Sequence, residues 1–372
     1  MSGGMELYLH MPFCVRKCAY CDFLSFPSGA KTQRMYAKRL MEDIGVMGKR
    51  YGEIPVETIF IGGGTPSVPD SGLIVEIMEH VRHAFHVADG AEISMEANPG
   101  TVTREKLTDY RKAGINRLSF GLQSANDREL KLLGRIHTWA EFLESFMLAR
   151  ECGFANLNID LMSALPGQTC ESWKETLSRV TDLDPEHISA YSLIIEEGTP
   201  FGERYGSEEG RKLLPDEDSE REMYHETKRF LKDCGYERYE ISNYAKPGRE
   251  CRHNIGYWTG VPYLGLGLGA SSYLDGCRFT VNPDMKQYLE EKPGMFTDIE
   301  KLTKKDMEEE FFYVGLRMTA GVSLSEFERR FGISAKEVYP GLMETFVKEK
   351  AARFEGDRFV LTDYGLDVSN YI

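Results

Sequence analysis

Residues 7–23 read LYLHMPFCVRKCAYCDF, and this stretch decides how the rest of the chain is interpreted. It places Cys14, Cys18 and Cys21 within eight residues, directly after an apolar run that is typical of a short β-strand. Three thiolates on one loop can hold three irons of a four-iron cluster and leave the fourth iron open to a substrate. One alternative is half of a zinc site, although zinc ligands usually come in paired C-x2-C units and the sequence has no second pair. A disulfide is the other.

The composition is that of an ordinary globular protein, with 372 residues of which 41% are hydrophobic and 28% charged. A chain of this length predicts one large domain and a smaller one. The net charge of −14 disfavours a nucleic-acid partner and an anionic membrane surface, because both attract basic proteins.

Two further features predict the compartment. The sequence has no apolar run long enough to cross a bilayer, and its start, MSGGMELYLH, lacks the charged and apolar regions of a signal peptide. The cysteines outside the first loop are scattered, at Cys152, Cys170, Cys234, Cys251 and Cys277. Because such isolated thiols are typical of a reducing compartment, we expect the protein in the cytoplasm.

The first two hundred residues alternate between short apolar runs and longer stretches with helical spacing. The predicted strands are Glu6–His10, Val56–Ile61, Glu92–Glu96, Arg117–Gln123, Asn156–Leu161 and His187–Ile195. Strand–helix repeats of this length predict parallel strands joined by right-handed crossovers. The spacing fits an open doubly wound sheet and a full or partial (β/α) barrel equally well.

Polar or glycine-rich residues follow five of the predicted strands. The cysteine loop follows the first, Gly62–Pro66 the second, Glu96–Gly100 the third, Gly121–Ser124 the fourth and Leu165–Thr169 the fifth, which also carries Asp160. In parallel α/β folds the site lies at the carboxyl ends of the strands, so we expect one shared cavity. Turns alone would explain the Gly and Pro residues, but they would not explain Glu96, Gln123 and Asp160.

Individual residue types in these patches suggest roles. Gly62–Pro66 is either a simple turn or a loop that lets backbone approach a ligand, since glycine has no side chain to obstruct it. Glu96 is a candidate anchor for an ammonium group, and Arg135 for a carboxylate through its planar fork. Asp160 could accept hydrogen bonds from ribose hydroxyls.

The combination resembles a known family. C-x3-C-x2-C after the first strand, GGGTP after the second and ENP-like Glu96–Pro99 after the third resemble a radical S-adenosylmethionine (SAM) enzyme. The similar subgroup contains the oxygen-independent coproporphyrinogen III oxidase and the heme chaperone HemW. The resemblance implies an incomplete (β/α)6 barrel, a [4Fe-4S] cluster on Cys14, Cys18 and Cys21, and SAM bound to the open iron. The implied SAM contacts are Tyr8, Gly64, Thr65, Glu96, Gln123, Arg135 and Asp160, with a looser match at Ile194.

Two departures from the oxidase favour the HemW side of the subgroup. In the oxidase a fourth cysteine follows two positions after the third, and here that position is Phe23. The oxidase also has a long N-terminal extension, whereas only thirteen residues precede Cys14 here. Both departures argue against decarboxylase activity, while neither abolishes the SAM site.

A second motif lies far downstream. Residues 253–258 read HNIGYW and resemble the H-N-x-x-Y-W heme motif of HemW proteins. A neutral imidazole is a common axial ligand of heme iron, so the predicted heme ligand is His253. Aromatic rings offer flat surfaces for a macrocycle. Cys251 is a candidate thiolate ligand that the family does not support. The glycines of Tyr263–Ala270 predict a strand under close backbone approach rather than a nucleotide loop.

The remaining residues predict a smaller domain. After the charged stretch 290–305, helices are expected at Met307–Met318, Leu324–Phe331 and Val338–Lys350, and a hairpin at Ala352–Thr362 that turns at Gly356-Asp357. Ser323 or Ser325 would cap the second helix. This pattern resembles a winged helix, which we interpret as a cover for the barrel or a protein-contact surface. The expected domains are residues 1–290, a radical SAM barrel with its extension, and residues 291–372, mainly helical.

Three functions remain open. The first is a heme chaperone that delivers heme to a respiratory or other hemoprotein, with cluster and SAM in a structural or gating role. The second is the SAM-dependent oxidase, which decarboxylates two propionates of coproporphyrinogen III. The third is a radical enzyme with another substrate, which the barrel alone would allow. Phe23 and the His253 motif favour the first. It implies a recipient hemoprotein, transient membrane association through that partner, a monomer or homodimer, and no nucleic acid.

Overall fold

The short apolar runs of the first half form six parallel strands. The computed structural model describes residues 3–369. Its strands are β1 (Met5–Met11), β2 (Val56–Gly63), β3 (Val87–Ala97), β4 (Arg117–Gln123), β5 (Leu157–Ser163) and β6 (His187–Ser192). They pair strictly in sequence order, each parallel to the next. A doubly wound sheet reverses its order at a switch point, so this order favours the barrel-like arrangement.

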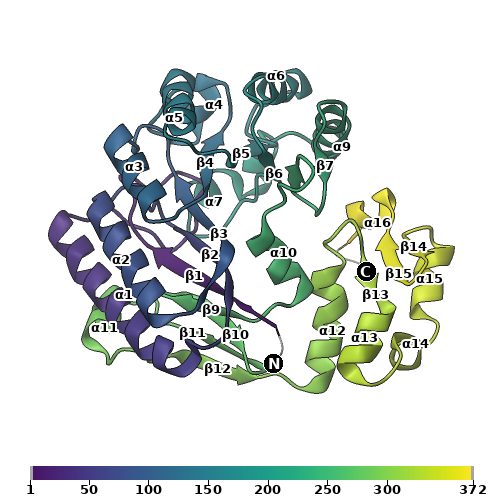
Figure 1. Ribbon diagram of the computed structural model, residues 1–372. Helices are drawn as coiled ribbons and strands as arrows, with labels where there is room; N and C mark the ends of the chain where they lie inside the picture. The colour runs from purple at the N-terminus through teal and green to yellow at the C-terminus, as the bar shows by residue number, and fades with distance from the viewer. Residues whose placement is uncertain (1–2, 370–372) are drawn as a thin grey trace.

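Helices connect these strands and cover the outer side of the curved sheet (Figure 1). They are α1 (Ala30–Tyr51), α2 (Ser71–Ala84), α3 (Arg104–Lys112), α4 (Asp127–Leu132), α5 (Trp139–Glu151) and α6 (Cys170–Thr181). Polar side chains cap the N-termini of several of these helices. Thr138 and Glu141 form a reciprocal capping box at α5, and Asp70 caps α2.

The second half of the barrel region extends the sheet at both edges. Three helices, α7 (Pro200–Tyr205), α8 (Glu208–Arg211) and α9 (Glu217–Asp233), lead to β7 (Glu237–Arg238) and β8 (Asn243–Ala245). β8 pairs with β6 in antiparallel orientation. At the other edge, β9 (Tyr263–Leu266) lies parallel to β1. The strands β10 (Ser271–Leu274), β11 (Cys277–Thr280) and β12 (Thr297–Lys301) follow it, with α11 (Met285–Glu290) between the last two.

The glycines of β9 have a packing reason. A Cβ at Gly265 would lie 2.2 Å from the carbonyl oxygen of Ser271, so only glycine allows β9 and β10 to approach this closely. Gly267 has a φ of +96°, a backbone conformation that L side chains rarely adopt. The prediction of a strand under close backbone approach is confirmed.

The C-terminal residues form a separate small core beside the barrel (Figure 1). Its helices are α12 (Lys304–Gly315), α13 (Leu324–Phe331), α14 (Ala335–Val338), α15 (Leu342–Lys348) and α16 (Asp363–Asp367). Its sheet has the order β13 (Val322–Ser323), β15 (Arg358–Leu361), β14 (Ala352–Glu355). Ser323, not Ser325, caps α13 by accepting from the Glu326 amide.

The third predicted helix and the predicted domain boundary differ in outcome. The helix predicted over Val338–Lys350 is confirmed only for α15, Leu342–Lys348, because Tyr339-Pro340-Gly341 separate it from α14, which ends at Val338. The boundary between residues 290 and 291 stays a prediction. β12 lies beyond it and pairs with β11 in the large sheet.

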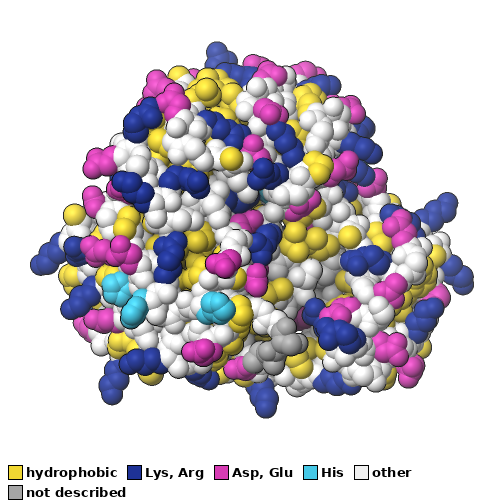
Figure 2. All heavy atoms as spheres, in the orientation of Figure 1, with side chains coloured by type: hydrophobic (Ala, Val, Ile, Leu, Met, Phe, Trp, Pro, Cys, Tyr) yellow, Lys and Arg dark blue, Asp and Glu magenta, His cyan; other side chains and the backbone are white. Residues whose placement is uncertain are grey.

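The surface carries both signs of charge. On the face shown in Figure 2, Lys and Arg side chains are interspersed with Asp and Glu side chains, and apolar groups lie between them. Among residues 3–369, no helix combines the length and apolar character needed to span a membrane.

The small domain should depend on one phenylalanine. Phe327 of α13 is fully buried, and its ring packs against Phe311, Phe312 and Phe331 at centroid distances of 5.4, 5.4 and 4.7 Å. Removing its ring leaves a cavity, so Phe327→Ala should lower the free energy of unfolding by about 3–5 kcal/mol in urea titrations followed by circular dichroism. Phe354→Ala, at a half-exposed ring of the same domain, is the control and should cost about 1 kcal/mol or less.

Candidate functional site

The cysteine loop connects β1 to α1 and is held at several points. The Cys14 amide donates to the Phe26 carbonyl at 3.1 Å, and the Ala19 amide donates to the Leu133 carbonyl at 3.0 Å. Cys14, Cys18 and Cys21 are half-buried, and none is in a disulfide. The loop therefore presents three free thiols from a backbone that neighbouring loops fix, at the carboxyl end of β1.

The glycine loop after β2 packs against the start of the cysteine loop. The Gly64 amide donates to the Met11 carbonyl at 2.8 Å, and the Thr65 amide donates to the Phe13 carbonyl at 2.7 Å. A Cβ at Gly64 would lie 2.8 Å from the backbone of Phe13, so glycine is needed for this packing. The Thr65 hydroxyl lies 3.5 Å from Cys14 Sγ. The loop thus positions the first cysteine, a role that the sequence did not predict.

Two buried carboxyl groups face the same space. Glu96, at the end of β3, accepts from the Gly63 amide at 3.0 Å. Burial raises its pKa to about 8, and the charge of Asp160 adds to the rise. Asp160, on β5, accepts from Ser119 at 3.0 Å and from Asn158 at 2.7 Å, and burial raises its pKa as well. Two carboxyls in so little water favour a cationic ligand, which would stabilise their charged forms.

Gln123 and Arg135 complete the strand-end residues. Gln123, the last residue of β4, is buried and has a φ of +74°, a strained conformation for a residue other than glycine. Arg135 Nη2 donates to Asn98 Oδ1 at 2.7 Å, and its Nη1 lies 3.6 Å from Cys18 Sγ. Among residues 3–369, the buried Nε of Arg135 has no hydrogen-bond partner. Arg135 thus has one unpaired N–H donor close to the cysteine loop, and a guanidinium is suited to a carboxylate.

A cavity of about 490 Å³ gathers most of the predicted residues. It lies within the size range of small-molecule sites. Its lining includes Tyr8, Cys21, Glu96, Gln123, Asp160, Ile194 and His253. The other predicted residues, Gly64, Thr65, Arg135, Cys14 and Cys18, lie outside that lining. The structure therefore brings side chains of several strand ends to one cavity and places the glycine loop behind them.

The residues present fit a cluster and SAM. Three free thiols on one loop suit a cluster, whose irons each take one thiolate. Buried carboxyls suit an ammonium or sulfonium charge, and the unpaired donor of Arg135 suits a carboxylate. In the described chain, no three His, Cys, Asp or Glu side chains are grouped closely enough to hold a single metal ion.

The HNIGYW segment lies in α10 (Arg252–Thr259), which packs against β2 and contacts Glu6 of β1. His253 is 1% exposed, with Nδ1 2.7 Å from the Thr58 hydroxyl and Nε2 3.0 Å from the Tyr257 hydroxyl. Burial, with the charge of Arg117, lowers its pKa to about 3. The imidazole is therefore neutral, and the Tyr257 hydroxyl occupies its Nε2.

Glu6 is a site residue that sequence reasoning missed. Its carboxyl lies 3.8 Å from His253 Nδ1, and burial raises its pKa to about 9. Glu6 and His253 are thus both neutral near pH 7, and the contact is not an ion pair. A Cβ at Gly256 would lie 1.9 Å from Glu6 Oε1, so Gly256 leaves room for this acid. The only signal in the sequence is an acidic residue inside an apolar strand.

Asn98 is a second missed residue. Its amide donates to the Thr65 hydroxyl at 2.7 Å, and its carbonyl oxygen accepts from Arg135 at 2.7 Å. It therefore joins the glycine loop to the arginine near Cys18. Its place two residues after Glu96 could have indicated this role.

Comparisons with known proteins agree with this geometry. Residues 8–180 match the radical SAM superfamily, and residues 302–368 match the HemN C-terminal domain. The heme chaperone HemW of Bacillus subtilis (strain 168) is 35% identical over 369 residues, which cover 98% of this chain and 97% of that protein. The chain belongs to the HemW family. HemW of Escherichia coli (strain K12) is likewise 35% identical, over 97% of this chain and 95% of its own.

A solved structure supports the fold of this HemW-family chain. Coproporphyrinogen III oxidase (HemN) from Escherichia coli superimposes with a TM-score of 0.84 over 99% of this chain and 89% of that one, at 23% identity. The predicted α/β radical SAM fold with a smaller C-terminal domain is confirmed. Membership of the superfamily also confirms an iron–sulfur cluster and SAM as cofactors.

Loss of a cluster cysteine should remove iron. Cys18→Ala, reconstituted anaerobically with iron and sulfide, should lose the four-iron absorption spectrum and most of its bound iron, because a thiolate ligand is missing. Cys234→Ala, at an exposed thiol, should keep both. A Cys18→Ala protein with a full four-iron spectrum would contradict the assignment, and tight zinc in the wild type would support the alternative site.

Glu6 should make stability depend on pH. Its carboxyl loses its proton near pH 4.5 in the unfolded chain but only near pH 9 in the folded one, so the folded state binds more protons between these values. Stability therefore falls as pH rises. From pH 6 to pH 8 the free energy of unfolding of the wild type should drop by about 2–3 kcal/mol relative to Glu6→Gln in urea titrations. Glu57→Gln, at a half-exposed neighbour on β2, should keep the wild-type profile.

Proposed function

We propose that this chain is a heme chaperone, which binds heme and passes it to a recipient hemoprotein. The observation that carries the proposal is the position of the HNIGYW segment. It lies in helix α10 and lines the cavity of about 490 Å³ described above, which is called the SAM-site cavity from here on. Full-length similarity to proteins named heme chaperone HemW supports it. The cluster and SAM would then serve a structural or gating role next to the heme.

We assign the cofactor contacts residue by residue. Cys14, Cys18 and Cys21 supply the thiolates of the cluster. The SAM residues are Tyr8, Gly64, Thr65, Glu96, Gln123, Arg135 and Asp160. Glu96 and Asp160 supply negative charge, Arg135 supplies N–H donors, and Gly64 and Thr65 act through the cysteine loop on which they pack. When bound to the cluster, SAM supplies one-electron chemistry.

His253 is the proposed axial ligand of the heme iron. Its low pKa keeps the ring unprotonated, which an iron ligand requires. The Thr58 hydroxyl holds Nδ1 and fixes the ring orientation, so that Nε2 is the nitrogen available for iron. Heme binding would then exchange the Nε2–Tyr257 contact for an Nε2–iron bond.

A coproporphyrinogen oxidase is the second candidate. The likeness of fold to HemN and the intact SAM cavity favour it. Phe23 stands where the oxidase has a fourth cysteine, and its ring is 65% exposed beside the cavity. Because this departure lies at the site itself, we rank the oxidase below the chaperone.

The partner follows from the chaperone role. We propose a recipient hemoprotein, and transient contact with the membrane through that partner. The chain would act as a monomer or homodimer without nucleic acid. All eight cysteines are free, which supports a reducing compartment such as the cytoplasm.

Heme titration of the reconstituted protein tests the proposal. The wild type should bind one heme per chain by Soret absorbance, and His253→Ala should weaken binding at least tenfold and change the spectrum, because the iron loses its protein ligand. His187→Ala removes an equally buried histidine that also contacts a tyrosine, and should leave the heme spectrum unchanged.

Two outcomes would contradict the chaperone. Heme binding below one per chain that His253→Ala does not alter would remove the proposed site. Conversion of coproporphyrinogen III to protoporphyrinogen IX, with SAM and a reductant, would establish the oxidase instead.

A further inference from the structure

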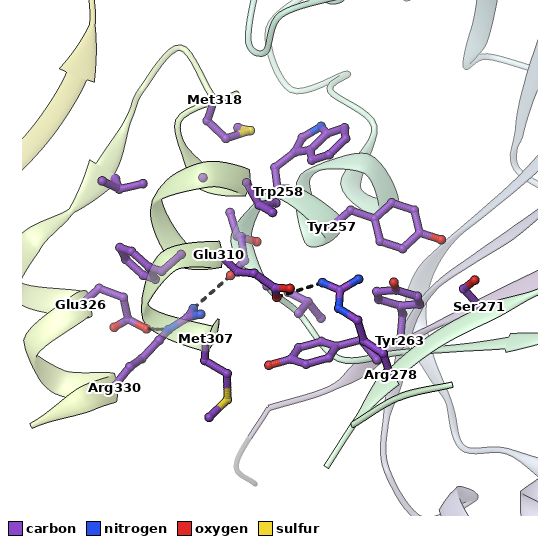
Figure 3. Close-up of a pocket in the computed structure, with 18 of the residues that line it drawn as sticks. Tyr257, Trp258, Tyr263, Ser271, Arg278, Met307, Glu310, Met318, Glu326 and Arg330 are labelled. Carbon is purple, nitrogen blue, oxygen red and sulfur yellow. Dashed lines mark hydrogen bonds and ion pairs between the residues drawn. The ribbon is translucent and has the colours of Figure 1, made fainter. Parts of the chain in front are cut away.

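A second cavity lies between the barrel and the C-terminal domain. Its volume is about 770 Å³, larger than that of the SAM-site cavity. The walls come from α10, the β9–β11 strands, α12 and α13, as Figure 3 shows. Residues from both domains are therefore needed to form it. Neither the SAM site nor the cluster loop accounts for this space.

Aromatic side chains form much of the wall. Tyr257 and Trp258 of the heme motif line it (Figure 3). Tyr263 and Tyr273 of the sheet and Phe311 of α12 also belong to its lining. The rings of Tyr257 and Tyr263 are 4.7 Å apart at their centroids. Aromatic rings exposed in a cavity of this size suit a planar, largely apolar ligand.

Two arginines enter the cavity from opposite sides, with Glu310 between them (Figure 3). Arg278 of β11 pairs with Glu310 at 2.9 Å. Arg330 of α13 pairs with Glu326 at 2.6 Å and donates to the Thr259 carbonyl of α10 at 3.1 Å. Such planar forks bind carboxylates through two parallel hydrogen bonds.

Basic side chains outnumber acidic side chains in the lining of this cavity. A third arginine, Arg358, lines it and donates to the carbonyls of Ala320 and Gly321, so three guanidinium groups face the two carboxylates of Glu310 and Glu326. Within residues 3–369, the buried Nε of Arg278 and the indole Nε1 of Trp258 have no hydrogen-bond partner. Unpaired buried donors are costly, and an anionic ligand that drew these side chains toward it would satisfy them.

We propose that this interdomain cavity is the heme-binding site, with its aromatic walls against the porphyrin ring and Arg278 and Arg330 on the two propionates. The assignment rests on the proposed chaperone function and adds the location and the carboxylate contacts. His253 lines the smaller cavity, and Tyr257, whose hydroxyl contacts His253 Nε2, lines both cavities. Tyr257 therefore links the imidazole to the interdomain cavity.

Adjacent arginines on α13 provide a matched test. Arg329 and Arg330 both pair with Glu326, but only Arg330 lines the cavity. Ferric heme is titrated into the full-length reconstituted protein and the Kd is taken from the Soret band. Arg330→Gln and Arg278→Gln should each raise the Kd about tenfold, because each removes a charge-assisted bond to a propionate. Arg329→Gln should stay within about twofold of the wild type.

Heme dimethyl ester separates a propionate contact from a structural effect. The ester has no carboxylates, so the wild type and both cavity variants should bind it with the same Kd. If Arg278→Gln and Arg330→Gln bind free heme as Arg329→Gln does, or remain weaker than the wild type toward the ester, the cavity assignment is wrong. A wild type that binds no heme would instead refute the chaperone proposal itself.

Discussion

The pairing of β1 with β2 is the constraint on which the site depends. Its register sets Met11 beside Gly63, so the loops that leave both strands start at the same height. The cysteine loop and the glycine loop then dock through backbone hydrogen bonds from Gly64 and Thr65. A shift of one residue would turn every side chain of β1 to the other face. Because β9 also pairs with β1, the same strand ties the cluster loop to the segment that follows the heme motif.

Burial of polar groups follows from this arrangement. The site sets Glu6, Glu96, Asp160 and His253 among packed strands, where charge is disfavoured. The two pairs of buried groups favour different ligands. Glu96 and Asp160 lie together with a free arginine donor nearby, which favours a zwitterionic ligand. Glu6 and His253 are both neutral, which favours a ligand that needs a lone pair.

The parallel strands and the cluster loop could be predicted from the sequence, because both depend on residues that are close together in the chain. Alternation of apolar runs located all six parallel strands to within a few residues, except for the start of β3 at Val87 and the end of β6 at Ser192. The spacing of Cys14, Cys18 and Cys21 indicated the cluster. What failed or was missed depends on contacts between distant residues. The packing role of Gly64 requires Phe13, and the neutral state of His253 results from its burial and from the charge of Arg117. The break at Pro340 was hidden by helical spacing on both sides.

The interdomain cavity could not be read from the sequence, since its walls come from residues 8 to 358. Its position gives the two halves of the chain a physical connection. Tyr8 and Tyr257 line both cavities, and Tyr8 contacts His10, which precedes the cysteine loop. A ligand that moves Tyr257 on one side therefore alters the wall of the SAM site on the other. In the proposed arrangement, linkage requires that SAM changes heme affinity by the same factor by which heme changes SAM affinity. The proposed gating of heme by the cluster and SAM would then need no turnover of SAM.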